Sequence, residues 1–192
     1  VENATHAAGY SSTTFTVVKN ESRIDSVVAS GEVLVGNNVT VNVTMVEGIT
    51  SGTVLIEING TNYTVAVGSD RVARLSVALG VGNYSANVYY VENDRFNGTS
   101  WSANPVSINV TGKPVPVIVI TVAGDVHLVG GTVTITATVD GVANVPVNIT
   151  VDGNAYPDGG FVVDHNGTYN VVASTVENAT HAAGYSSTTF TV

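Results

Sequence analysis

The sequence contains no cysteine and little charge. Among its 192 residues the absence of cysteine excludes disulfide bonds and thiolate metal sites. Charged residues make up 11% of the chain, and 6 Lys and Arg against 15 Asp and Glu give a formal net charge of −9. Nucleic-acid binders need a basic stripe, and attraction to anionic lipid needs basic clusters. We therefore expect no nucleic-acid partner and no electrostatic attraction to a membrane.

Long hydrophobic runs are also missing. A bilayer-spanning helix needs roughly 18–20 apolar residues, and the longest candidate, Val115 to Ala123, is interrupted by Pro116 and Thr121. Neither end of the sequence resembles a signal peptide. We expect no membrane insertion by this segment, and any export signal or anchor would lie outside it.

Good helix formers are scarce, whereas residues typical of strands and turns are common. Gln is absent and Met45 is the single methionine, while Val, Thr, Asn, Gly and Ser dominate. Enrichment in β-branched residues with dense turn signals is typical of strands. The sequence therefore predicts an all-β fold.

Apolar and polar residues alternate along several segments of the first half. Val39 to Met45 places apolar residues at odd positions and polar residues at even ones, the period of a half-buried antiparallel strand. The same pattern covers Val54 to Ile58, and Asn59-Gly60 then predicts a hairpin turn, because such pairs tolerate positive φ. Further alternation runs from Tyr84 to Tyr90 and from Val106 to Val110.

The second half repeats this plan. Val133 lies 94 residues after Val39, and Tyr169 lies 85 after Tyr84, so about eight residues are missing from the middle of the second half. About seven strands in a module of roughly 100 residues are typical of an immunoglobulin-like sandwich. We therefore predict two tandem Ig-like modules, residues 18–112 and 113–192.

Smaller features recur in both modules. Asp152-Gly153 repeats the turn chemistry of Asn59-Gly60. A glycine two residues before Tyr84 and Tyr169 predicts a tyrosine corner in each module, with a core tyrosine as the simpler alternative. The only two lysines, Lys19 and Lys113, each begin a module, and we interpret them as linker residues.

One stretch occurs twice without a change. Residues 1–17 and residues 176–192 both read VENATHAAGYSSTTFTV, which sets a repeat period of 175 residues. We interpret residues 1–17 as the closing strand of a preceding repeat, with Thr13, Phe15 and Val17 on one face. An isolated strand would expose unpaired backbone and a bare apolar face, so its partners must lie elsewhere. A covalent array supplies them from preceding chain, which the identity of the copies favours, and strand donation supplies them from another subunit.

Twelve Asn-x-Ser/Thr sequons make the chain a candidate glycoprotein. Such sequons are acceptors for N-linked glycans in exported proteins, although a chain rich in Asn and Thr also produces some by chance. The candidate asparagines are Asn3, Asn20, Asn38, Asn42, Asn59, Asn62, Asn83, Asn97, Asn109, Asn148, Asn166 and Asn178. Because charge is sparse, glycans would help to solvate this surface.

Metal and catalytic patterns are weak. Asp152, Asn154 and Asp158 have the alternating spacing of a calcium loop, but Pro157 replaces the loop glycine and no closing glutamate follows. The four histidines fit no metal-binding or general-base pattern, and no nucleophile elbow or phosphate loop is present. We expect no enzyme activity, no cofactor and no calcium site.

The segments Ile58 to Tyr63, Gly82 to Tyr90 and Glu177 to Val192 resemble Ig-like repeats of adhesin-like surface proteins from methanogenic archaea. The resemblance covers both modules and implies an extracellular location at the cell surface, in long stalks or fibres. It carries over no catalytic residue.

The leading hypothesis is a structural repeat of an extracellular filament or stalk, whose partners are neighbouring copies of the same repeat. The alternative is an adhesin module that binds cells or glycans through loops at one end of a sandwich. For that alternative, Phe96, Trp101 and Tyr185 are candidate exposed aromatic residues.

Overall fold

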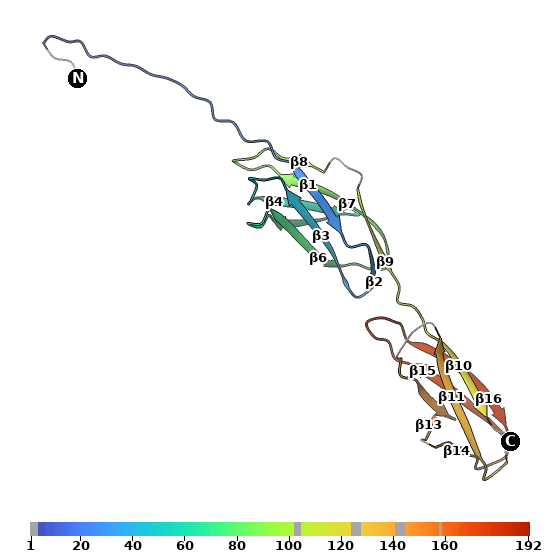
Figure 1. Cartoon of the computed structure of the whole chain (residues 1–192). Helices are drawn as coiled ribbons and strands as arrows, with labels where there is room; N and C mark the ends of the chain where they lie inside the picture. The colour runs from blue at the N-terminus through green and yellow to red at the C-terminus, as the bar shows by residue number, and fades with distance from the viewer. Residues whose placement is uncertain (1–3, 102–104, 124–127, 141–144, 158) are drawn as a thin grey trace. The chain divides into compact units, whose positions relative to one another are not determined.

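The computed structural model describes residues 4–101, 105–123, 128–140, 145–157 and 159–192. These residues form sixteen β-strands and no helix, and they divide into two compact units. The predicted all-β fold of Ig-like sandwiches is confirmed. We call the strands β1–β9 module 1 and the strands β10–β16 module 2 (Figure 1).

Module 1 is built from two sheets. One has the order β1-β3-β6 and contains β1 (Ile24–Ala29), β3 (Asn38–Met45) and β6 (Val72–Ala78). The other has the order β2-β9-β7-β4-β5 and contains β2 (Glu32–Leu34), β9 (Val106–Thr111), β7 (Gly82–Val91), β4 (Thr53–Ile58) and β5 (Thr61–Ala66). The short strand β8 (Thr99–Ser100) pairs with β7 beside this path.

The core of module 1 follows directly from the alternation in the sequence. Along β3 the residues Val39, Val41, Val43 and Met45 are fully buried, while the residues between them are exposed or half-buried. Successive side chains of a strand point to opposite faces, so one face of β3 meets the other sheet. Aliphatic residues of β4 and β7 supply the other side of this core.

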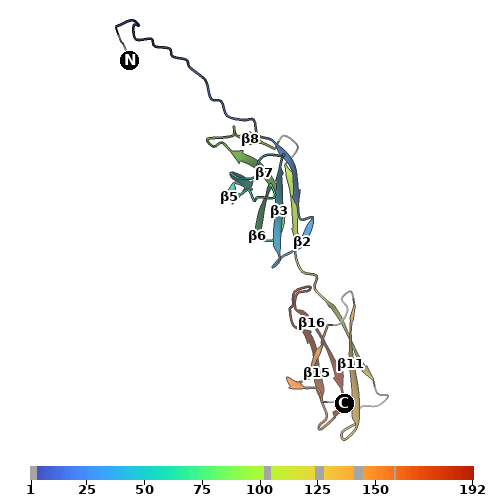
Figure 2. The same ribbon diagram turned by 60° about the vertical axis from the view of Figure 1, so that its left-hand side comes forward.

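Module 2 also consists of two sheets. One has the order β10-β11-β14 and contains β10 (Val117–Ala123), β11 (Thr132–Asp140) and β14 (Phe161–Val162). The other has the order β13-β12-β15-β16 and contains β13 (Asn154–Ala155), β12 (Asn148–Val151), β15 (Thr168–Thr175) and β16 (Gly184–Thr191). Figure 2 shows β11 on one side of this module and β15 with β16 on the other.

The core of module 2 contains residues from both of its sheets. The buried residues that cluster there are Val133, Ile135, Val151, Val163, Tyr169, Val171 and Phe190. Phe190 comes from β16, the edge strand of its sheet, so the core is complete only when β16 is in place.

The two predicted hairpin turns are confirmed. Asn59 and Gly60 have φ angles of 45° and 83°, and Asp152 and Gly153 have φ angles of 47° and 81°. Positive φ at both central residues defines the type I′ turn, whose twist matches that of the flanking strands. Each turn also bonds to the next strand of its sheet, since Asn59 Oδ1 accepts from the Ser85 N–H and Asp152 Oδ1 from the Asn170 N–H.

The missing residues of the second half shorten two strands. The strands β5 and β6 of module 1 have 6 and 7 residues, whereas β13 and β14 of module 2 have 2 residues each. At the end of the modules it is module 1 that has the shorter strands. It has two separate strands, β8 and β9, where module 2 has the single strand β16.

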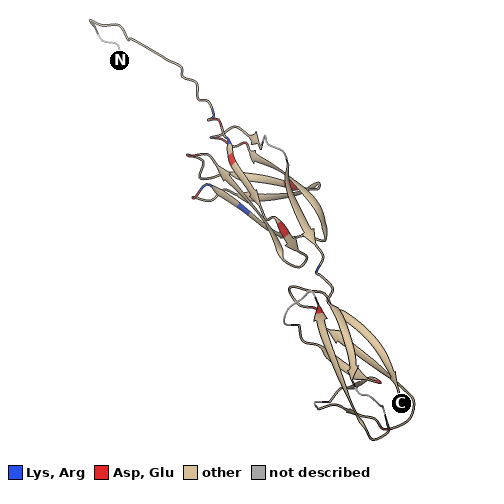
Figure 3. Ribbon diagram, turned by 45° about the vertical axis from the view of Figure 1, so that its right-hand side comes forward, with Lys and Arg blue, Asp and Glu red and all other residues tan. Residues whose placement is uncertain are grey.

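Charge is thinly spread over both modules. Figure 3 shows the charged positions as isolated colours on a mostly uncharged ribbon. Within the described residues we find no helix of the length and apolarity that a membrane span requires.

Candidate inter-repeat strand site

Strand β16 closes module 2 along the edge of β15. Eight residue pairs join the two strands in antiparallel register, from Thr168 opposite Thr191 to Thr175 opposite Gly184. Beyond the strand, Val192 and Gly167 exchange backbone hydrogen bonds of 2.9 and 3.3 Å. The strand is therefore held by backbone bonding over its whole length.

Phe190 anchors β16 in the core. Its ring stacks on Tyr169 at 5.0 Å between centroids and meets Phe161 edge-on at 6.5 Å. Only 6% of Phe190 is exposed. Aromatic pairs of this geometry stabilise a core beyond the effect of the area they bury.

The first residue of β16, Gly184, lies too close to its neighbours to carry a side chain. The Gly184 N–H donates to Thr175 Oγ1 at 2.8 Å. A Cβ at Gly184 would lie 2.9 Å from that same oxygen and 3.0 Å from the carbonyl oxygen of Pro116. Glycine is thus required here by the close approach of the chain and not by its backbone angle.

The turn before β16 is organised by side chains. Asn178 Oδ1 accepts hydrogen bonds from the backbone N–H groups of Thr180 and His181. His181 is 1% exposed, and its Nδ1 lies 2.9 Å from the carbonyl oxygen of Ala182, so this nitrogen carries the proton and donates. Its Nε2 is buried without a hydrogen-bond partner.

Two contacts tie this turn to the beginning of module 2. The Ala182 N–H donates to the carbonyl oxygen of Pro114 at 3.0 Å, and Lys113 Nζ lies 2.6 Å from Glu177 Oε1. The hydrogen bond and positive charge of Lys113 lower the pKa of Glu177 below its ordinary value. Lys113 is therefore more than the linker residue that we predicted.

Module 1 contains the equivalent arrangement. Lys19 forms an ion pair with Glu92, and Asn93 Oδ1 accepts from the N–H groups of Arg95 and Phe96. Glu92 and Glu177 are 85 residues apart, and Lys19 and Lys113 are 94 apart. The lysine offset equals that between Val39 and Val133, and the glutamate offset equals that between Tyr84 and Tyr169, so the equivalence of the two pairs could have been read from the sequence.

The N-terminal copy of the same sequence is in a different state. Residues 4–17 contain no strand, and every one of them is exposed, including Tyr10 at 91%, Phe15 at 86% and Val17 at 81% (Figure 1). The equivalents of Thr13, Phe15 and Val17 in the second copy are Thr188, Phe190 and Val192. In that copy Phe190 is buried and the other two are half-buried, so the three residues share the inward face.

The difference between the copies comes from their surroundings. Local sequence is identical at residues 4–17 and 179–192, so intrinsic propensity cannot separate them. The second copy pairs with β15, whereas no strand of the described chain pairs with residues 4–17. A strand without a partner leaves its backbone groups unpaired, which explains why the predicted strand at residues 13–17 is not formed here.

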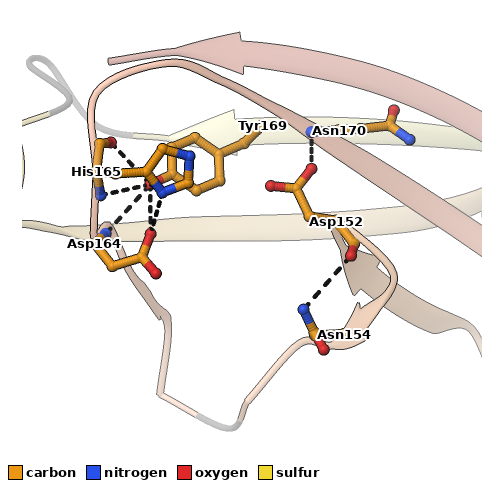
Figure 4. Close-up of polar contacts among 6 residues, drawn as sticks. All are labelled: Asp152, Asn154, Asp164, His165, Tyr169 and Asn170. Carbon is orange, nitrogen blue, oxygen red and sulfur yellow. Dashed lines mark hydrogen bonds and ion pairs between the residues drawn. The ribbon is translucent and has the colours of Figure 1, made fainter.

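Tyr169 forms the tyrosine corner that the sequence predicts for module 2 (Figure 4). Its hydroxyl accepts from the N–H groups of Asp164 and His165 at 3.2 and 3.0 Å. The hydroxyl proton can reach Asp164 Oδ1 at 2.8 Å or the His165 carbonyl oxygen at 2.9 Å. This corner fixes the ring on which Phe190 stacks. In module 1, Tyr84 is half-buried on β7.

The corner perturbs two titrating groups. Hydrogen bonds from the Tyr169 hydroxyl and the His165 ring lower the pKa of Asp164 below its ordinary value. Burial, and the bond to the Asp164 carboxylate, raise the pKa of Tyr169. The corner is therefore best formed when Asp164 is ionised.

We expect Asp164→Asn to flatten the acid dependence of module 2 stability. A carboxylate whose folded pKa is depressed contributes stability above its unfolded pKa, and this stability is lost as the pH falls below the unfolded pKa and through the folded pKa. Urea unfolding of the chain at about pH 7 and about pH 3 measures the loss, in the part of the circular dichroism transition that tryptophan fluorescence does not follow. The variant should lose less stability than the wild type between these two conditions.

The matched control is Asp70→Asn in module 1. The Arg74 guanidinium, which bonds to Asp70, lowers the pKa of that carboxyl too. Trp101 is the single tryptophan and belongs to module 1, so its fluorescence reports that module. Asp70→Asn should alter only the unfolding transition of module 1, the one that fluorescence follows. An unchanged acid dependence of module 2 in Asp164→Asn would contradict the assignment.

The candidate glycosylation sites are mostly accessible. Asn3 lies outside the described residues. Among the eleven others, Asn42 and Asn97 are half-buried. The exposed ones are Asn20, Asn38, Asn59, Asn62, Asn83, Asn109, Asn148, Asn166 and Asn178. The side-chain oxygens of Asn59 and Asn178 are occupied by turn hydrogen bonds.

The weak calcium pattern is not assembled by the described residues. Asp152 accepts from the Asn170 N–H, and Asn154 Nδ2 reaches the carbonyl oxygen of Asp152 (Figure 4). Asp158 lies outside the described part of the chain. Within that part, no group of three or more His, Asp or Glu side chains is placed to hold a metal ion.

Of the three aromatic candidates for a binding surface, Phe96 is corrected by the structure. It is 8% exposed and packs edge-on against Tyr90, because the turn at Asn93 directs it into the core. Trp101 is half-buried, and Tyr185 is 68% exposed on β16. A surface cluster of the three is therefore excluded.

No protein-family model matches this sequence, and no curated protein matches it. Among solved structures, one match is described as "Structures of Clostridium thermocellum CbhA fibronectin(III)-like modules". It is 17% identical, covers 89% of this chain and 93% of that chain, and has a TM-score of 0.37. A TM-score this low says nothing specific about the chain, and the fold is assigned from the sheets described above.

Proposed function

We propose that this chain is a structural repeat unit of an extracellular cell-surface filament or stalk built from tandem Ig-like modules. In this proposal residues 1–17 close the last sandwich of the preceding repeat, as residues 176–192 close module 2. The supporting observation is one sequence in two states, with Phe15 exposed and Phe190 buried. The segment buries its phenylalanine as Phe190 but leaves it in water as Phe15, and exposure of such an apolar ring is unfavourable.

The extracellular location is supported by the surface of the modules. The exposed sequons could carry glycans, and with a formal charge of −9 from few charged residues the polar surface is otherwise mainly Thr, Ser and Asn. The adhesin alternative has less support, because Phe96 is buried and the described residues bring no aromatic cluster to one loop end.

Extending the chain at its N-terminus tests the proposal directly. Residues 113–175 placed before residue 1 would be followed by VENATHAAGYSSTTFTV, as they are within the chain. We expect the backbone amides of residues 4–17 to become protected from hydrogen exchange in this extended chain, because they gain a partner strand. In the chain of 192 residues the same amides should exchange freely.

The control is the same extended chain with Phe15→Asp. Burying an unpaired carboxylate at this position is strongly unfavourable, so the strand should no longer dock and the protection from exchange should disappear. If residues 4–17 remain unprotected in the extended chain without the substitution, the tandem arrangement is wrong.

A further inference from the structure

We infer that residues 4–17 are a docking strand, and that a second copy of this chain can accept it in the groove that β16 occupies. The inference rests on the proposed function, because both require this segment to complete a sandwich. It goes further in naming a partner that is not covalently joined. The result would be a head-to-tail contact between separate chains.

The groove has a defined chemistry. Its edge is the backbone of β15, which pairs in antiparallel register with all eight residues of β16. Its floor is apolar and includes Tyr169, Val171 and Phe161. At its far end, Thr175 Oγ1 accepts a backbone N–H, and the Pro116 carbonyl leaves room for hydrogen only.

Residues 4–17 match every one of these requirements. Subtracting the period of 175 residues places Phe15 opposite Tyr169, Thr13 opposite Val171 and Gly9 opposite Thr175. Gly9 has no side chain to collide with the Pro116 carbonyl, and once docked its N–H would donate to Thr175 Oγ1, as the Gly184 N–H does. A groove that accepts one copy of the sequence must accept the other.

Competition decides when docking occurs. Strand β16 follows β15 in the same chain through only the residues 176–183, so its effective concentration at the groove is high, on the order of millimolar. An identical strand on another molecule at micromolar concentration cannot displace it. Docking therefore requires that the resident β16 be weakened, and the resulting contact is heterologous and continues as an open chain.

The experiment uses the full chain with Phe190→Asp, which disables the resident strand and leaves Phe15 intact. We expect this variant to form linear oligomers at micromolar concentration, raising its weight-average mass at least about twofold in light scattering after size exclusion. The wild type and Phe15→Asp should remain monomeric. The double variant Phe15→Asp/Phe190→Asp should also remain monomeric, since it has no competent strand.

A second measurement covers the case in which Phe190→Asp unfolds module 2. A synthetic peptide of residues 1–17 is added to the double variant, and hydrogen exchange of β15 is followed. Restored protection of Thr168–Thr175 supports docking, and a peptide with Asp at the position of Phe15 should restore none. Trp101 fluorescence verifies that module 1 stays folded.

Several outcomes would overturn the inference. One is a monomeric Phe190→Asp chain whose β15 no peptide protects, and another is equal oligomerisation of the double variant. If residues 4–17 are nevertheless protected in the covalently extended chain, the proposed function stands and the strand acts only within one polypeptide. If that protection also fails, both are wrong.

Discussion

Phe190→Ala should destabilise module 2 by about 3–5 kcal/mol, the usual cost of truncating a buried phenylalanine. The ring is 6% exposed and packs against Tyr169 and Phe161, so its removal leaves these two rings without their partner. Since small domains have only about 5–15 kcal/mol of stability in total, much of module 2 stability would be lost.

The matched control is Phe15→Ala. Phe15 has the same sequence neighbours as Phe190 but is 86% exposed, so its truncation should change stability by less than about 0.5 kcal/mol. In urea unfolding, circular dichroism follows both modules and Trp101 fluorescence follows module 1 alone, so the transition seen only by circular dichroism is that of module 2. The module 1 transition should be unaffected by either change. Equal effects of the two substitutions would contradict the burial of Phe190 in the core of module 2.

This pair also marks the limit of what sequence reasoning can predict. Alternation predicted β3 and the equivalent β11, because burial of one face of a strand imposes a period of two. Turn chemistry predicted both hairpins at Asn59-Gly60 and Asp152-Gly153, since their φ angles depend on local residues. No local property distinguishes Phe15 from Phe190, and only the neighbouring strand decides between exposure and burial.

The predictions for Phe96 and Lys113 were wrong because the contacts of these residues also depend on distant parts of the fold. Phe96 was predicted to be an exposed loop residue, yet the Asn93 turn directs it against Tyr90. Lys113 was interpreted as part of a linker, yet it pairs with Glu177, 64 residues away. Loop side chains follow no period, so their partners depend on the assembled fold.

The turns at Asn93 and Asn178 unify these observations. In both modules a glutamate pairs with the lysine that begins the module, and the next residue, an asparagine, caps a turn that buries a ring. The buried ring is Phe96 in module 1 and His181 in module 2. The closing segment of each module is therefore bonded to the module's own beginning. Residues 1–17 contain the same Glu-Asn-x-x-His sequence, as the proposed closing of another such module requires.

Gly184→Val should destabilise module 2 by roughly 1–3 kcal/mol through overpacking, with further loss if the strand shifts away from Thr175. A Cβ there would press on Thr175 Oγ1 at 2.9 Å and on the Pro116 carbonyl oxygen at 3.0 Å. Valine is otherwise a favourable strand residue, so propensity would predict the opposite sign. Urea unfolding of module 2 distinguishes the two expectations.

Gly9→Val is the matched change, and its effect should depend on what precedes the chain. In the chain of 192 residues a Cβ at Gly9 meets no atom within 4 Å, so we expect no change in stability. In the chain extended by residues 113–175, Gly9 would take the place that Gly184 has in module 2, next to a second Thr175 and Pro116. The same substitution should then cost as much as Gly184→Val and should increase hydrogen exchange of residues 4–17. A Gly9→Val variant that is neutral in both chains would mean that the N-terminal copy never enters a sandwich in the register of β16.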